Sequence, residues 1–161
     1  MTENFSDGQP EYQSLVQLPE GAVLAFDFGK KRIGVAIGNN MLGIARPLMT
    51  INNEVTEQRF AVIAQLLDIW QPVLLVVGLP MHSDGTAHEL TQLSQRFARR
   101  LAGRFNIKVI LKDERYTSQT ASIALREAGV AGRKQKSVLD QVAAQQILQS
   151  FFDEQHAITR R

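Results

Sequence analysis

Cysteine is absent from the chain and histidine is scarce, and both shortages narrow the chemistry open to the protein. Without cysteine there are no disulfides and no thiolate metal ligands. The 3 histidines, His82, His88 and His156, show neither HxxxH nor HExxH spacing, so we do not expect a zinc site. No apolar run approaches the ~20 residues of a membrane span, and no basic start followed by an apolar core suggests secretion. The sequence therefore predicts a cytoplasmic protein without a membrane part.

Length and composition predict one globular domain. At 161 residues, with 44% hydrophobic and 21% charged residues, the chain can bury a sizeable core. The polar residues 1–20 are expected to form a flexible tail, residues 21–155 the domain, and residues 156–161 a short carboxyl-terminal tail. Nothing in the sequence distinguishes a monomer from a homodimer.

The distribution of charge is more informative than its formal total of +2. Basic residues gather in three clusters, at 30–32, from Arg96 to Arg104, and at 133–136. Taken alone, each cluster is most simply a solvated helix face or loop. Two of the clusters, however, lie next to acidic motifs, and solubility does not require that arrangement.

Hydrophobic periodicity predicts alternating strands and helices. We expect strands over 23–28, 32–38, 43–51, 73–77 and 107–113, and helices over 54–70, 86–105, 117–128 and 137–155. Pro47 interrupts the third strand, which is expected to end there or to lie at an edge of the sheet. Asn52 or Asn53 is expected to cap the first helix, Gly78-Leu-Pro80 to form a turn after a strand, and residues 129–136 to form a mobile basic loop. The order predicts an α/β fold with a mixed five-stranded sheet and helices on both faces.

Asp27 stands out within the opening hairpin, which runs from Val23 to Gly38. A carboxylate in an otherwise apolar strand is costly unless a charged or hydrogen-bonding group meets it. Gly29 allows the chain to turn at once, and Lys30-Lys31-Arg32 lies on that turn. This pattern indicates a bound cation at Asp27 with phosphate close by.

A second acidic position follows the strand over 107–113, which ends in Asp113-Glu114-Arg115. Functional side chains of parallel strands gather at their carboxyl ends. Adjacent strand residues face opposite ways, so only one of Asp113 and Glu114 can face the site. The alternation does not decide between them, and either carboxylate could simply pair with Arg115.

Asp140 is the third acidic candidate. With Ser137 it fits a capping-box pattern, which would give it a purely structural role. The first turn of a helix can also aim a carboxylate at a metal held by a neighbouring strand. The small residues Ala143 and Ala144 would let this helix approach the sheet closely and bring Asp140 near Asp27.

Carboxylates from two strands and one helix, without His or Cys, would form an all-oxygen site of the kind that suits Mg²⁺ or Mn²⁺. Such ions can activate water and stabilise the leaving oxygen in phosphodiester cleavage. Basic residues around the site would hold a nucleic-acid backbone by its phosphates. The residues expected in this role are Lys30, Lys31, Arg32, Arg115, Arg133, Lys134 and Lys136.

Four motifs in order resemble those of the YqgF/RuvX family of Holliday-junction-resolvase-like nucleases. They are Asp27-Phe-Gly-Lys-Lys-Arg-Ile-Gly-Val-Ala36, Gly78-Leu-Pro80 with Asp84-Gly85, Asp113-Glu-Arg-Tyr-Thr-Ser118, and Lys136-Ser-Val-Leu-Asp140 with Ala143-Ala144. The resemblance covers about residues 22–153. It implies a three-layer RNase H-like fold and a bacterial cytoplasmic nuclease that processes the 5′ end of precursor 16S ribosomal RNA. It also implies that Asp27, Glu114 and Asp140 are the catalytic and metal-binding residues, with Asp113 beside them.

Other functions remain open at this point. The same resemblance allows a Holliday junction resolvase that acts on branched DNA in recombination and repair. A non-catalytic RNA-binding factor in ribosome assembly would need the acidic residues only for structure. A nucleotide phosphotransferase of the actin and sugar kinase type is disfavoured, because that fold needs two such domains and the chain has no second copy of the hairpin.

Overall fold

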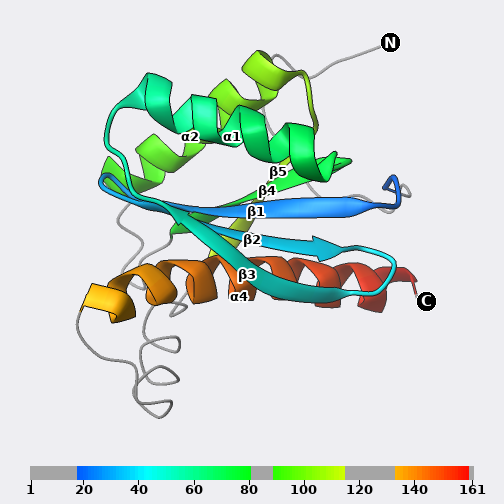
Figure 1. Cartoon of the computed structure of the whole chain (residues 1–161). Helices are drawn as coiled ribbons and strands as arrows, with labels where there is room; N and C mark the ends of the chain where they lie inside the picture. Colours follow the sequence, from blue (N-terminus) through cyan, green and yellow to red (C-terminus); the bar gives the residue numbers. More distant parts are fainter. Residues whose placement is uncertain (1–17, 81–88, 115–132, 160–161) are drawn as a thin grey trace.

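A mixed five-stranded sheet forms the centre of the protein (Figure 1). The structure is a computed structural model that describes residues 18–80, 89–114 and 133–159. The strands are β1 (Ala22–Phe28), β2 (Ile33–Asn39), β3 (Ile44–Ile51), β4 (Leu74–Pro80) and β5 (Val109–Glu114), and the helices are α1 (Thr56–Trp70), α2 (Glu89–Phe105) and α4 (Arg133–Thr159). The strand order is β3-β2-β1-β4-β5. The first three strands pair antiparallel, whereas β4 lies parallel to both β1 and β5.

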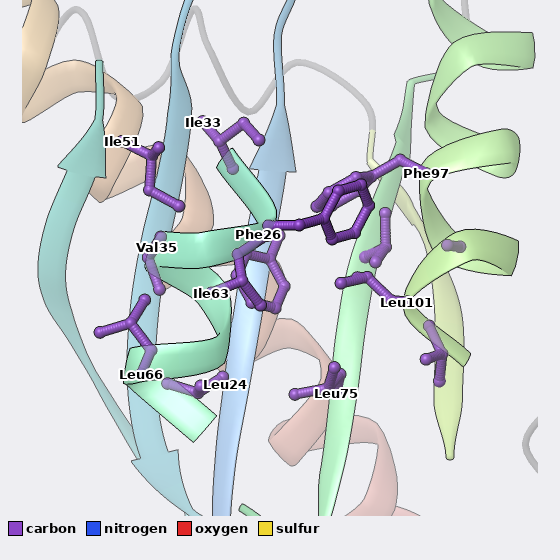
Figure 2. Close-up of a cluster of buried hydrophobic side chains, with 14 of the residues drawn as sticks. Leu24, Phe26, Ile33, Val35, Ile51, Ile63, Leu66, Leu75, Phe97 and Leu101 are labelled. Carbon is purple, nitrogen blue, oxygen red and sulfur yellow. The ribbon is translucent and has the colours of Figure 1, made fainter. Parts of the chain in front are cut away.

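Alternation along β1 divides the interior into two cores. Leu24 and Phe26 pack under α1 and α2, and Val23 and Ala25 pack under α4. Figure 1 shows α1 and α2 on one face of the sheet and α4 on the other, and Figure 2 shows Phe26 within the first core. Phe26 meets the ring of Phe97 edge-on, with 5.8 Å between ring centroids. The predicted α/β fold, with a mixed five-stranded sheet covered on both faces, is confirmed.

Helix α4 lies unusually close to the sheet because small residues face each other at the contact. A Cβ atom on Gly34 of β2 would lie 1.9 Å from the backbone oxygen of Asp140. On the helix side, Ala143 and Ala144 are buried against the sheet. The close approach expected from these alanines is therefore present, and the backbone of α4 itself rests on β2.

Glutamine side chains also attach α4 to the outer strand β3. Gln149 accepts a hydrogen bond from the Ala45 amide (3.0 Å) and donates one to the Gly43 carbonyl (2.8 Å). One turn earlier, Gln145 donates to the Ala45 carbonyl (3.0 Å). These bonds prevent α4 from sliding along its axis, in addition to holding it close to the sheet.

Two local predictions about turns and caps are wrong. Residues 78–80 do not form a turn, because β4 continues to Pro80 and pairs with β5 as far as Glu114. Neither asparagine caps α1, whose N-cap is Val55 without a side-chain hydrogen bond. Asn53 instead accepts a hydrogen bond from the Val55 amide (2.8 Å), which is a local Asx turn before the helix.

The start of α4 also differs from the prediction. The helix begins at Arg133, so residues 133–136 are helical and are not part of a mobile loop. Ser137 lies inside the helix, where its carbonyl accepts a hydrogen bond from the Thr50 hydroxyl (2.7 Å), and the capping-box prediction is wrong. At its other end α4 runs to Thr159, beyond the predicted end at 155.

Several predictions lie outside the described residues, namely the amino-terminal tail over 1–17, the helix over 117–128, residues 129–132 of the basic loop, and Arg115. The division into one domain and two tails stays a prediction. No helix in the described part of the chain is both long and apolar enough to cross a membrane.

We predict that Gly34→Ala destabilises the protein by more than about 2 kcal/mol, because α4 must lift off β2 to make room for the methyl group. Thermal unfolding measures the effect. Gly103→Ala in α2 is the matched control, since its new Cβ would meet nothing within 4 Å, and helix propensity should make it neutral or stabilising by up to about 1 kcal/mol. Equal destabilisation by both substitutions would contradict the close contact.

Candidate active site

Two carboxyl groups, those of Asp27 and Glu114, meet at one end of the sheet. Asp27 lies near the end of β1 and Glu114 ends β5, with β4 between these strands. The two side chains are hydrogen-bonded to each other. Gly78 of β4 leaves the necessary room, because a Cβ there would lie 2.5 Å from Oε2 of Glu114.

The structure decides which carboxylate of β5 faces this site. Ile110 packs in the core under α4, so Lys112 and Glu114 lie on the same face by alternation. Lys112 indeed pairs with Glu154 of α4 at 2.9 Å. Asp113 lies on the other face and is exposed. Glu114 therefore joins Asp27, and Asp113 does not.

The Asp27–Glu114 pair has perturbed acidity. Partial burial raises the pKa of Asp27 well above its ordinary value of 3.8, and the nearby charge of Glu114, the hydrogen bond with it and the charge of Asp140 raise it further. Burial also raises the pKa of Glu114. Two like charges in contact favour one proton shared by the pair.

Asp140 lies beside this pair and has a different partner. Its backbone oxygen lies against Gly34, which pairs with Asp27 across the hairpin. Its carboxylate Oδ2 accepts a hydrogen bond from Nε of Arg32 at 2.6 Å. Asp140 is thus close enough to raise the pKa of Asp27, while Arg32 neutralises its own charge.

The oxygen-only donor set of Asp27, Glu114 and Asp140 matches the preference of Mg²⁺ and Mn²⁺. Within the described ranges, however, no three acidic or histidine side chains stand together in an arrangement that could hold an ion. The salt bridge with Arg32 accounts for the position of Asp140. The chemistry of the donors fits such a cation. For all three carboxylates to bind it, Asp140 would have to exchange its salt bridge with Arg32 for the ion.

Arg59 of α1 holds the basic turn in place, and the sequence analysis did not identify it. Its guanidinium is buried and donates hydrogen bonds to the carbonyls of Gly29 and Lys30 (both 2.7 Å) and to the carbonyl of Asn53. It also lies over the ring of Phe28, 5.3 Å from the centroid. The available signal was spacing, because Arg59 precedes the buried Ile63 by four residues and so shares its helix face.

The basic residues predicted to bind nucleic acid have different surroundings. Lys30 pairs with Glu89 at the start of α2 (2.5 Å), Arg32 pairs with Asp140, and Lys31 is exposed. Lys136 is exposed in the first part of α4, where Arg133 and Lys134 also lie in the helix. The basic turn is therefore connected to α1, α2 and α4 at once.

Comparisons with known proteins give a consistent result. A family model described as "RuvX: Holliday junction resolvase" matches residues 21–154. A Nitrosospira multiformis protein named "putative pre-16S rRNA nuclease" is 60% identical over 149 residues, which is 92% of this chain and 99% of that protein. A Methylobacillus flagellatus protein of the same name is 63% identical over 133 residues, 83% of this chain and 91% of that protein. Among solved structures, T. thermophilus RuvC in complex with a Holliday junction substrate aligns with a TM-score of 0.54 at 17% identity, over 85% of this chain and 96% of that chain; this likeness concerns the fold alone.

We predict that Asp27→Asn stabilises the metal-free protein at neutral pH. A carboxyl group whose pKa is raised by folding favours the folded state while it is protonated, and that contribution is lost as the pH rises through the raised pKa. The amide cannot ionise, so the variant should unfold a few degrees higher at pH 7, since each kcal/mol corresponds to roughly 2–4 °C in a chain of this size. The difference should shrink towards pH 4, where Asp27 is protonated in the parent. Melting curves across pH measure this, with the exposed Asp113→Asn as control; a lower melting temperature for Asp27→Asn at pH 7 would contradict the shared proton.

We predict that Arg59→Met destabilises the protein by about 2–3 kcal/mol, because the carbonyls of Gly29 and Lys30 lose their donors in a partly buried turn. Thermal unfolding measures the loss, with the exposed Arg46→Met as control. If both variants melt together with the parent, Arg59 does not hold the turn.

Proposed function

Since the chain belongs to the RuvX family, we propose that it is a nuclease that hydrolyses phosphodiester bonds, and that its substrate is the 5′ region of precursor 16S ribosomal RNA. The relatives that carry a pre-16S rRNA nuclease name match nearly the whole chain and support this substrate. The observation that carries the chemistry is the contact of Asp27 with Glu114 at the strand ends, with Asp140 beside them.

We assign the catalytic and metal-binding roles to Asp27, Glu114 and Asp140. These residues would hold Mg²⁺ or Mn²⁺, which when bound supplies an activated water and stabilises charge on the leaving oxygen. A cation bound there would favour the charged form of both carboxylates, so the proton that Asp27 and Glu114 share would be released to solvent. The exposed Asp113 has no role in this arrangement.

Arg32 is the residue that connects substrate binding to this acidic group. Its guanidinium bonds Asp140, and a substrate phosphate would offer it a second anionic partner. Exchange of that partner frees the Asp140 carboxylate for the site. Lys31, exposed on the same turn, adds a further contact to the backbone without reading its sequence.

Cleavage of branched DNA is the second candidate function. The printed description of the matching family, a Holliday junction resolvase, favours it. Both substrates carry the same scissile bond, so the two candidates differ in the shape of nucleic acid that the surface accepts. The competing reading as a non-catalytic RNA-binding factor requires that the acidic residues be dispensable.

The test is cleavage of a precursor 16S RNA fragment and of a four-way DNA junction with Mg²⁺ or Mn²⁺ present. We predict that Asp27→Asn, Glu114→Gln and Asp140→Asn each slow cleavage by about 100-fold or more, the range for loss of a group that acts in the transition state. Asp113→Asn is the control and should cleave like the parent. Undiminished cleavage by Asp27→Asn would overturn the assignment, and cleavage of the junction in place of RNA would favour the second candidate.

A further inference from the structure

Two adjoining cavities form a groove between α1 and α2, on the face of the sheet opposite α4. One has a volume of about 180 Å³ and the other of about 570 Å³, and both are bordered by Thr56, Phe60 and Arg100. The smaller cavity also reaches Phe28, at the end of β1. We refer to these two cavities together as the α1–α2 groove.

The α1–α2 groove is strongly basic. Four arginines and one glutamate contribute to its walls, namely Arg59, Arg96, Arg100, Arg104 and Glu57. Arg104 is already paired with Glu57 (2.6 Å), and Arg59 donates to backbone carbonyls. Arg96 and Arg100 are exposed and form no salt bridge with any described residue. The charge of Arg100 contributes to lowering the pKa of Glu57, but no salt bridge to the described part of the chain holds either guanidinium, so both can contact an anionic ligand.

The charge of the groove, more than its volume, favours a polyanion. The smaller cavity, at about 180 Å³, lies below the roughly 300–1,000 Å³ of ordinary small-molecule pockets, whereas the larger, at about 570 Å³, lies within that range. The walls of the smaller cavity include the aromatic residues Phe28, Phe60 and Phe97 beside the arginines. Phe60 and Phe97 are buried in the core, so the exposed guanidinium groups supply the contacts. Such groups suit nucleic-acid phosphates, which they hold without regard to sequence.

The end of β1 borders both the groove and the candidate active site. Asp27 and Phe28 are neighbours in β1 and face opposite sides of the sheet, so the acidic pair and the groove begin at the same place. The basic turn over 29–32 lies between them, and Arg59 connects that turn to the groove. Arg96 and Arg100 line the same cavity as Phe28.

We propose that the α1–α2 groove binds the phosphate backbone of a single-stranded segment of the RNA substrate, away from the cleaved bond, with Arg96 and Arg100 as its principal contacts. The proposal rests on the proposed function in that it takes the substrate to be RNA. It assigns a binding role to the basic cluster on α2, which lies outside the acidic site.

The test measures binding of a fluorescent polyuridine oligonucleotide of about 20 nucleotides, long enough to span more than one contact region, as a function of salt. All proteins carry Asp27→Asn, so cleavage does not interfere. Arg96→Gln with Arg100→Gln should weaken binding about tenfold and lower the slope of log affinity against log salt by about 1.4, since each phosphate contact on a single strand contributes roughly 0.7.

The matched control is Arg99→Gln with Arg46→Gln, which removes the same charge from exposed residues that border neither cavity. Its binding and salt slope should follow those of the Asp27→Asn parent, and melting temperatures check that both variants fold. Equal weakening in the two double variants would reduce the effect to net charge and overturn the proposal, as would unchanged binding in both. Loss of self-association in place of RNA binding, seen by sedimentation, would assign the groove to a second copy of the chain and also overturn it.

The outcome is separable from that of the proposed function. If the protein with Asp27 intact cleaves no RNA but the groove variant alone loses binding, the groove assignment stands and the nuclease assignment fails. If the protein with Asp27 intact cleaves RNA and the groove variant binds like its control, the groove assignment fails alone.

Discussion

The contact between the backbone of α4 and Gly34 is the constraint on which the arrangement of the acidic residues depends. The helix can reach this height only because β2 has no side chain at that position. Gly34 is also the cross-strand partner of Asp27, so the same contact places Asp140 beside the acidic pair. The absence of a side chain at Gly34 fixes the position of α4, because a helix packed directly against backbone has little freedom to shift. The strands themselves bring Asp27 and Glu114 together, and the contact at Gly34 adds Asp140 to them.

The parts of the fold that could be predicted from sequence are those that depend on patterns among residues close together in the chain. The apolar runs and their alternation were enough for the strands, and the misplaced charge at Asp27 was enough to single out the site. The choice between Asp113 and Glu114 was not available locally, because it depends on how far β5 keeps its alternation. Pairing with β4 up to Pro80 maintains that alternation to the last residue, and this pairing is a tertiary fact.

The remaining errors have the same origin. Gly78 and Pro80 have turn-forming propensity, but pairing with β5 and the need for space beside Glu114 keep them in the sheet. Residues 133–136 lack helical periodicity, yet they extend a helix that Thr50 and the glutamines already hold on the sheet. Arg59 could not be identified from sequence because its hydrogen bonds are to backbone carbonyls of a turn that is distant in the chain. In each case contacts far apart in sequence outweigh local preference.

The glutamines that join α4 to β3 have a consequence for the solution behaviour of the protein. β3 is an outer strand of the sheet, and such strands offer unpaired backbone groups to any other extended chain. At Gly43 and Ala45 these groups are occupied by Gln145 and Gln149 of the last helix. The carboxyl-terminal helix therefore blocks the addition of another strand at this end of β3. During synthesis, before α4 has formed, the same backbone groups are free to pair with another extended chain.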